Sequence, residues 1–453
     1  MNDLRTCWVL GLGESGEGAA ELLRRESVSV VALDAASSPA ILDAAARLEG
    51  LGVDARPGAT QLPMGAADLC VVSPGIPAEA PWLLACKERG IPIVSELELA
   101  WQRRKARVLA VTGSNGKTTL VRLLEQILQR AGLRAAAAGN IGPCLSRVVD
   151  QPLDWLVVEV SSFQLEWVKK FRADVGILLN LLPNHLDRHG TMDHYAALKA
   201  RLFAQAEQHD LCLVEASCMD RVRSQSSGAG HWLSFGAGPD ADLRFRQGWI
   251  EAGGRAVADL RGTMFDHPVT GPAAVAAWAA ARACGVSNDR FEAAIRDFQP
   301  LPHRMQAAGR MDGVRYINDS KATNLAAMVA ALQRCVGRVH LIAGGLAKEN
   351  DFLAAKDFLV ERAAGVYLIG SASKAMFDAW SADVACQQCG DLETAFSRAA
   401  AVAKSGETVL LSPGCASFDQ FPGYESRGAR FLELVDQRSR FVEEVESAEE
   451  AWK

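Results

Sequence analysis

Several kinds of feature are missing from this 453-residue chain, and each absence excludes a class of protein. Acidic residues outnumber basic ones, 54 to 48, so the chain lacks the basic excess that nucleic-acid-binding proteins usually carry. Its most apolar stretch, Pro272 to Ala281, is too short to cross a bilayer and is alanine-rich like a packed helix. The first residues show no signal-peptide pattern. We therefore expect a cytoplasmic protein with no membrane insertion and no nucleic-acid partner.

Close cysteine pairs, repeats and biased segments are also scarce. Of the eleven cysteines, Cys386 and Cys389 form the only close pair, and one CxxC without a second pair is a weak metal signal, so we expect reduced thiols. There is no internal repeat, low-complexity tract or coiled-coil heptad. With 49% hydrophobic and 23% charged residues the chain has an ordinary globular composition, and its length predicts about three domains.

A phosphate-binding loop is the most informative motif that is present. The stretch from Thr112 to Thr119 follows the apolar run Val108 to Val111 and precedes leucines and isoleucines spaced as one helix face. Strand, glycine loop, Lys-Thr and helix form the context in which backbone N–H groups bind a nucleotide triphosphate. Lys117 would reach the outer phosphates and Thr118 would hold Mg²⁺. The other predicted ATP contacts of the loop are Gly113, Ser114, Asn115, Gly116 and Thr119.

Alternating strand and helix patterns divide the chain into three α/β domains in series. We predict a Rossmann-like domain over residues 1–100, a central P-loop ATPase-type domain over 101–303 and a Rossmann-like domain over 304–453. Arg103 to Lys105 indicates a solvated linker, and Gln299 to Pro302 the next linker. Predicted strands are 7–10, 28–33, 69–72, 154–160, 175–179, 315–317, 339–343, 366–370 and 409–411, and predicted helices include 273–284, 322–333, 353–360 and 392–403.

A second glycine motif follows the first predicted strand. Gly11, Gly13 and Gly16, with Asp34 ending the next strand, match the dinucleotide fingerprint and taken alone indicate an NAD-dependent oxidoreductase. The physical requirement is only a close approach of the backbone to a diphosphate at a helix N-terminus, so a nucleotide-sugar diphosphate fits as well. A purely structural tight turn is the third interpretation. The separate triphosphate loop argues against a pure NAD enzyme.

Polar residues at predicted strand ends supply candidate chemistry. Glu159 ends an apolar strand beside the phosphate loop, where a nucleotide's Mg²⁺ needs a hard oxygen ligand. His185 and Asp187 lie in a polar loop after the next strand, and His185 is a candidate for metal or substrate contact. Lys199 lies on a helical stretch, and nothing in its local pattern distinguishes it from a surface lysine. Three polar stretches in the last predicted domain each follow a predicted strand: 318–324, 344–348 and 412–419. Ligands bind at the carboxyl ends of parallel strands, and the two lysines in these stretches suit an anionic small molecule.

In this order, and over essentially the whole chain, these motifs resemble the Mur ligase family. The strings that begin at Glu159 and at Asn318 are typical of its glutamate-adding member. The matching stretches are 112–119, 139–142, 159–165, 184–188, 302–304, 318–324, 344–348 and 412–420.

The resemblance implies three α/β domains that bind, in order, the UDP part of the substrate, ATP and the amino acid. It implies an ATP-dependent ligase that joins D-glutamate to UDP-N-acetylmuramoyl-L-alanine through an acyl phosphate in peptidoglycan precursor synthesis. The family uses two Mg²⁺ ions: Thr118 and Glu159 match the first site, and His185 and Lys199 match the second. The lysine that matches Lys199 is carbamylated in the family, which would make it a carboxylate-like ligand. Small molecules are the implied partners, and we expect a monomer.

Other roles are carried over motif by motif. The predicted UDP-substrate contacts are Ser15, Asp34, Ser73, Gly75, Asn140, Ser161 and Gln164. The predicted nucleotide contacts of the third domain are Arg304, Asp319 and Lys321. The predicted glutamate contacts are Thr323, Lys348, Ser417 and Tyr424.

The chain departs from the family pattern in places, and alternatives stay open. The asparagines that help to hold adenine are missing from the stretch that contains Ala273, Ala274 and Ala277, and Ala35 and Ala36 replace a threonine and a basic residue. Tyr424 stands where the best-known members have phenylalanine.

Three rival interpretations of the function remain: an L-glutamate-adding enzyme, another Mur or folylpolyglutamate-type ligase, and a nucleotide-gated binding protein. The paired metal-site residues argue against the last, because a switch does not need a second metal.

Overall fold

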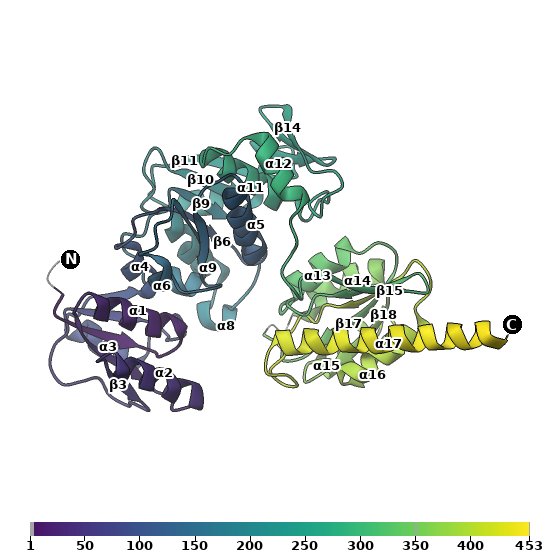
Figure 1. Ribbon diagram of the computed structural model, residues 1–453, viewed down its shortest axis with the longest axis horizontal. Coiled ribbons are helices and arrows are strands. Elements are labelled where there is room, and N and C mark those ends of the chain that lie inside the picture. The colour runs from purple at the N-terminus through teal and green to yellow at the C-terminus, as the bar shows by residue number, and fades with distance from the viewer. Residues whose placement is uncertain (1–3, 349–350, 453) are drawn as a thin grey trace. The chain divides into compact units, whose positions relative to one another are not determined.

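The computed structural model describes residues 4–348 and 351–452, and it contains three α/β domains in series, each built on its own sheet (Figure 1). The chain divides into two compact units. The first holds the N-terminal and central domains and runs to Leu181, with Arg188–Phe298 added; the second holds Leu182–Asp187 and the chain from Gln299 onward. The predicted fold class is confirmed, whereas the exact domain boundaries stay predictions.

The N-terminal domain is a five-stranded parallel sheet with the order β3-β2-β1-β4-β5. The central strands β1 and β4 are buried apolar runs, such as Cys-Trp-Val-Leu in β1, as expected of a sheet covered on both faces. The strands are β1 (Thr6–Leu10), β2 (Ser29–Asp34), β3 (Asp54–Pro57), β4 (Leu69–Val72) and β5 (Ile93–Ser95), and the helices are α1 (Glu14–Arg25), α2 (Pro39–Gly50), α3 (Pro81–Glu88) and α4 (Glu96–Trp101).

The central domain is a nine-stranded sheet in which β6 lies between β9 and β8. Its strand pairs are parallel except for β12 with β13 and β13 with β14, and the sequence patterns did not predict these three strands. Its strands are β6 (Arg107–Thr112), β7 (Ala135–Gly139), β8 (Trp155–Glu159), β9 (Val175–Leu178), β10 (Leu211–Glu215), β11 (His231–Gly236), β12 (Leu243–Arg246), β13 (Trp249–Ala252) and β14 (Arg255–Asp259). Its α-helices are α5 (Lys117–Arg130), α6 (Leu145–Val148), α7 (Ser162–Leu165), α8 (Leu186–His189), α9 (Met192–Ala200), α10 (Met219–Ser224), α11 (Gly271–Ala283) and α12 (Asn288–Arg296), with 3-10 turns at Arg201–Phe203 and Ala216–Cys218.

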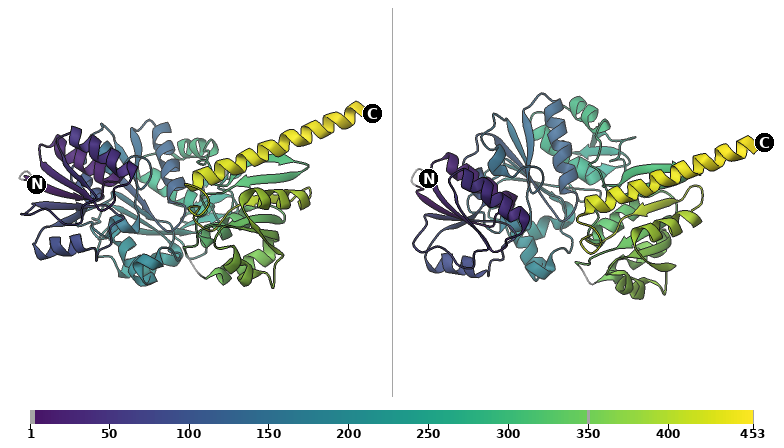
Figure 2. Two further views of the ribbon diagram at one scale, coloured as in Figure 1. Left: turned by 90° about the horizontal axis from the view of Figure 1, so that it is seen from below. Right: turned by 60° about the horizontal axis from the view of Figure 1, so that its bottom comes forward.

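The C-terminal domain is a six-stranded sheet with the order β15-β16-β20-β17-β18-β19, in which β15 alone is antiparallel. Two helices differ from prediction: α13 begins at Leu325, after the N-cap Asn324, and the predicted helix 353–360 is a 3-10 turn followed by α14. The strands are β15 (Gln306–Met311), β16 (Val314–Asn318), β17 (Val339–Gly344), β18 (Ala363–Ile369), β19 (Cys386–Gly390) and β20 (Thr408–Leu411), and the helices are α13 (Leu325–Arg334), the 3-10 turn Phe352–Ala355, α14 (Lys356–Arg362), α15 (Ser373–Trp380), α16 (Leu392–Val402) and α17 (Tyr424–Trp452), the long helix of Figure 2.

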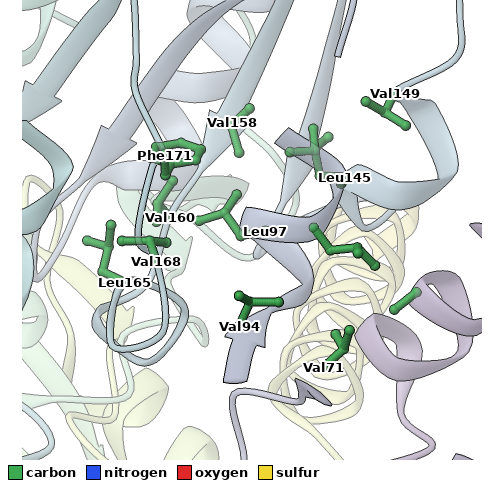
Figure 3. Packing of buried hydrophobic residues seen from close by; sticks show 14 of the residues in the cluster. Val71, Val94, Leu97, Leu145, Val149, Val158, Val160, Leu165, Val168 and Phe171 are labelled. Atoms are coloured by element: carbon green, nitrogen blue, oxygen red, sulfur yellow. The ribbon is translucent and has the colours of Figure 1, made fainter. Parts of the chain in front are cut away.

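One continuous hydrophobic core joins the N-terminal and central domains. Val94 and Leu97 of the first domain pack with Val158, Val160 and Phe171 of the second, as Figure 3 shows. Next to this core, the carboxylate of Glu98 is fully buried and accepts hydrogen bonds from the backbone N–H groups of residues 169–171 at 2.9–3.0 Å. These contacts make the first two domains a single compact unit.

The predicted solvated linker at residues 103–105 is wrong for its two arginines. Arg103 forms a bidentate salt bridge with Glu26 at 2.5 and 2.6 Å, and its side chain is only 12% exposed. The guanidinium of Arg104 lies 3.9 Å from the ring centroid of Trp101, and burial lowers its pKa. Both arginines are half-buried, which a local charge pattern does not reveal, whereas Lys105 is exposed.

The eleven cysteines all lie in the described part of the chain, and none of them forms a disulfide. Within the described part of the chain, no helix is long and apolar enough to cross a membrane.

Candidate active site

The phosphate-binding loop connects β6 to α5 in the strand–loop–helix arrangement that the sequence predicts. Gly116 adopts a left-handed conformation, φ 83°, at the N-cap of α5, which lets the chain turn sharply into the helix. The buried leucines of α5 hold the helix against the sheet. Lys117 folds back over the loop, and its Nζ donates to the carbonyl oxygens of Gly113 at 2.8 Å and Ser114 at 2.9 Å. The lysine ammonium and the helix N-terminus thus lie at one loop.

Thr118 and Glu159 meet beside this loop. Because β6 and β8 are paired, the end of β8 brings Glu159 next to the first turn of α5. Both side chains are buried, and Thr118 Oγ1 donates to Glu159 Oε2 at 2.8 Å. Asn140 Nδ2 donates to the other carboxylate oxygen, Oε1, at 2.9 Å. A hydroxyl and a carboxylate at this spacing are the hard oxygen donors that Mg²⁺ prefers.

Lys199 is buried in the same place, although its local sequence resembles that of a surface lysine. Its side chain is 1% exposed, and Nζ donates to Gly113 O at 3.0 Å and to Thr112 Oγ1 at 3.2 Å. Burial lowers the pKa of Lys199 well below its usual range, the nearby charge of Lys117 adds to that effect, and Glu159 opposes it. The structure therefore brings together Lys117, Glu159 and Lys199, and it favours a neutral Lys199 amine.

His185 lies in Leu182–Asp187, the short segment that groups with the second unit. Its backbone is left-handed, φ 55°, in the loop before α8. Its predicted pairing with Lys199 at a second metal stays a prediction. The side chain of Asp187 lies outside the described residues.

Three of the predicted UDP-binding residues, Ser15, Asp34 and Ser73, follow or contact the turn after β1. Asp34 accepts hydrogen bonds from the backbone N–H groups of Leu12 and Ala36, both at 2.8 Å, and Ser73 Oγ donates to Gly11 O at 3.4 Å. A Cβ on Gly16 would lie 1.8 Å from Gly11 O, so this turn requires glycine. Ser15 lies in the first turn of α1, and the carbonyl of Gly75 accepts a hydrogen bond from Arg188 at 3.2 Å. These neighbours suit a diphosphate site, and nucleotide contact stays a prediction.

Ser161 and Gln164 bind each other at the start of α7. Gln164 Oε1 accepts from Ser161 N at 2.9 Å and from Ser161 Oγ at 3.0 Å, and Ser161 Oγ caps Gln164 N. This capping box gives both residues a structural role beside their predicted substrate contact.

The three polar clusters of the C-terminal domain meet at one sheet edge, because β16, β20 and β17 are neighbours. Ser412 Oγ donates to Asp319 Oδ2 at 3.0 Å, and a backbone bridge joins Leu346 to Ala416. Burial raises the pKa of Asp319 to about 6. Of the other predicted contacts, Ser417 is buried, Thr323 and Arg304 are half-buried, Lys348 is exposed, and Lys321 Nζ lies 3.7 Å from the ring centroid of Tyr424.

Arg427, on the first turn of α17, was missed by sequence reasoning. It is 1% exposed, and its guanidinium donates to Ser320 Oγ at 3.0 Å, Ser320 O at 2.9 Å and Cys415 O at 3.1 Å, with a longer contact of 3.4 Å to Ala416 O. It thereby ties the loop after β16 to the loop after β20. No motif or periodic pattern in the sequence singles out this arginine for such a role.

The alanines at the start of α11 do not replace the missing adenine contacts. Ala274 and Ala277 are fully buried in the core of the central domain. A Cβ on Gly271 would come within 2.3 Å of the Phe245 ring, so the helix start packs directly on β12.

Three family models match the chain. They are described as the Mur ligase MurD-like N-terminal domain, over residues 5–95, the Mur ligase middle domain, over 111–267, and the Mur ligase, glutamate ligase domain, over 303–415.

Curated relatives match over nearly the full length. A UDP-N-acetylmuramoylalanine–D-glutamate ligase of Acidobacterium capsulatum is 38% identical over 94% of this chain and 95% of its own. A protein of the same name from Koribacter versatilis is 38% identical over 94% of this chain and 96% of its own.

Solved structures share the fold. MurF ligase of Thermotoga maritima in complex with ADP matches with a TM-score of 0.60 at 19% identity, over 90% of this chain and 96% of its own. UDP-N-acetylmuramate–alanine ligase MurC of the same organism matches with a TM-score of 0.58 at 16% identity, over 96% and 100%.

Proposed function

This chain belongs to the Mur ligase family, and we propose that it uses ATP to join D-glutamate to UDP-N-acetylmuramoyl-L-alanine. The observation that carries this proposal is the meeting of Lys117, the Thr118–Glu159 pair and buried Lys199 at one phosphate-binding loop. Relatives at 34–38% identity are named as D-glutamate ligases, which supports the D enantiomer over L-glutamate. The match to a MurD-like N-terminal domain supports a UDP-linked substrate over a folate.

The chemistry begins with activation of a carboxylate, which is a poor acyl donor because its leaving group would be oxide. An oxygen of the L-alanyl carboxylate attacks the γ-phosphorus, the bond from that phosphorus to the bridging oxygen breaks, and ADP leaves. Lys117 and the amides at the start of α5 would hold the phosphates in line and stabilise the negative charge of the transition state. The glutamate amine then attacks the acyl phosphate carbon, loses a proton, and inorganic phosphate leaves as the amide forms.

Thr118 and Glu159 fit a magnesium ion. Their oxygens lie 2.8 Å apart on buried side chains, and the carboxylate supplies the negative charge that a divalent cation requires. A magnesium ion held there would neutralise phosphate charge. Asn140 would keep the Glu159 carboxylate in a fixed orientation through its hydrogen bond to Oε1.

Lys199 fits a second magnesium site only after modification, because an amine is a poor ligand for this cation. Its lowered pKa favours the neutral amine, which can attack carbon dioxide: an N–C bond forms, one C–O π bond opens, and a proton leaves to water. The product is an anionic carbamate with two hard oxygens, which His185 would help to place at a metal. We include this carbamate in the proposal.

The remaining predicted roles belong to the same proposal. Residues 1–100 would bind the UDP-linked substrate, residues 101–303 ATP and residues 304–453 glutamate, and the protein would act as a monomer in the cytoplasm.

The test measures phosphate release from ATP in the presence of Mg²⁺ and UDP-N-acetylmuramoyl-L-alanine, and compares reactions with D-glutamate, with L-glutamate and with no amino acid. Release that requires D-glutamate supports the proposal; release that requires L-glutamate keeps the reaction and changes the substrate; no release with either refutes it.

A further inference from the structure

The carboxyl end of β9 lies directly against the phosphate-binding loop. In the parallel pairing of β6 with β9, Thr112 is opposite Leu178, and just beyond this last pair Leu179 N donates to Thr112 O at 3.0 Å. The φ of Gly113 is 144°, which side-chain-bearing residues rarely adopt, and a Cβ there would lie only 3.0 Å from Leu179 Cβ, so the position favours glycine. The first part of the loop is therefore built on residues 179 and 180.

Asn180 extends this strand pairing with its side chain. Its backbone carbonyl accepts a hydrogen bond from Ser114 N at 3.1 Å. Its side-chain Oδ1 accepts from Ser114 N at 3.0 Å and from Asn115 N at 2.9 Å, while Nδ2 donates to Asn115 O at 3.1 Å. One side-chain amide thus satisfies both the N–H and the C=O of Asn115, as a neighbouring strand would.

We propose that Asn180 is a positioning residue for ATP, holding residues 113–115 so that the amides at the N-terminus of α5 face the phosphates. The proposal rests on the proposed function, since it assumes that this loop binds ATP. The first amides of a helix have no acceptor within the helix, so those of Lys117, Thr118 and Thr119 suit an anion. Because Oδ1 already accepts the amides of Ser114 and Asn115, the phosphates are directed to the helix end of the loop.

Preorganisation is the physical advantage of this arrangement. A glycine-containing loop that must order itself on binding loses conformational entropy, which weakens affinity for the nucleotide. Lys117 donates hydrogen bonds to the carbonyl groups of Gly113 and Ser114, and Asn180 accepts hydrogen bonds from the N–H groups of Ser114 and Asn115. The loop is thus fixed from both sides.

The neutral charge of the asparagine amide also matters. Aspartate has the same shape and could still accept the two N–H groups. Its second oxygen would face Asn115 O, placing two acceptors together, and its negative charge would lie beside a triphosphate. An amide avoids both problems, because it donates on one side and accepts on the other.

The test compares Asn180→Ala and Asn180→Asp with Asn288→Ala as the matched control. Asn288 is also half-buried and makes two side-chain hydrogen bonds in the same unit, but its partners, Trp278 and Val257, lie on α11 and β14. For each variant, KM for ATP, KM for UDP-N-acetylmuramoyl-L-alanine and kcat are measured, together with ADP affinity by calorimetry and thermal unfolding.

We expect Asn180→Ala to raise KM for ATP and Kd for ADP about ten- to a hundredfold, the loss of two or three hydrogen bonds. KM for the muramoyl substrate should stay within about twofold, and Asn180→Asp should weaken ADP binding more than Asn180→Ala does. A nucleotide affinity for Asn180→Ala equal to that of Asn288→Ala, or a parallel rise of both KM values, overturns the assignment. The ligase proposal can fail separately, because ADP calorimetry reports on Asn180 even if the wild-type protein releases no phosphate.

Discussion

Arg427 offers a sharp test of how the C-terminal domain holds its loops. We predict that Arg427→Met will lower the free energy of unfolding of this domain by about 3 kcal/mol. Arg427 is 1% exposed, and its replacement removes the hydrogen bonds that its guanidinium donates to the carbonyl oxygens of Ser320 and Cys415. A hydrogen bond from a charged group contributes about 1.5–3 kcal/mol. The unfavourable burial of the cation, which lowers the pKa of Arg427 to about 10, offsets part of this loss.

The matched control is Arg430→Met, one turn further along α17. Arg430 forms surface ion pairs with Glu393 and Glu433, and its side chain is 34% exposed, so its loss should cost under about 1 kcal/mol. For a domain of this size, a loss of 3 kcal/mol lowers the melting temperature by about 6–12 °C. Calorimetric unfolding of both variants measures the difference. Equal melting temperatures would refute the assigned role of the buried arginine.

The same variant should affect glutamate binding. Ser320 and Cys415 belong to the loops that carry the predicted contacts Thr323 and Ser417, so loosening them should raise KM for D-glutamate more than KM for ATP. Arg427→Lys should keep part of the stability and part of the glutamate affinity that Arg427→Met loses, because lysine retains the charge but lacks the planar set of donors of a guanidinium.

Three further predictions concern single titratable groups. Lys117→Ala should abolish phosphate release, because it removes the ammonium at the phosphate loop; normal turnover would refute ATP binding at this site. Lys199→Ala should be nearly inactive and partly restored by added acetate or formate, whereas full activity without them would remove the second-metal role. For Asp319, the folded pKa of about 6 exceeds the ordinary 3.8, so its burial lowers stability progressively as pH rises from about 4 to 6. Asp319→Asn should remove that part of the pH dependence and raise the free energy of unfolding at pH 7 by up to about 3 kcal/mol, measured by urea unfolding; an unchanged pH profile would contradict it.

Local sequence patterns predicted the elements that carry the chemistry. The phosphate loop was recognisable because strand, glycine turn and helix follow one another directly, and Glu159 because it ends an apolar strand. The meeting of the 318–324, 344–348 and 412–419 stretches at one edge followed from the rule that carboxyl ends of parallel strands lie together. These features can be predicted because they depend only on neighbouring residues in the sequence and on the rule that the carboxyl ends of parallel strands lie together.

Local patterns did not show features that depend on contacts between segments far apart in the chain. Lys199 and Arg427 look like surface residues locally, and only the packing of α9 and α17 buries them. Asn180 lies 65 residues from Asn115, and strand pairing brings them together. The antiparallel pairings of β13 with β12 and β14, and the joint core of the first two domains, were likewise not predicted from the sequence.

The most direct test of the proposed reaction follows one oxygen atom. UDP-N-acetylmuramoyl-L-alanine labelled with heavy oxygen in its L-alanyl carboxylate is incubated with ATP, Mg²⁺, D-glutamate and the protein. If the carboxylate attacks the γ-phosphorus and the glutamate amine then expels phosphate, one labelled oxygen must appear in each inorganic phosphate released. Mass spectrometry of the phosphate should show that label in step with amide formation. Phosphate released without the label would contradict the acyl-phosphate ligation that we propose for this chain.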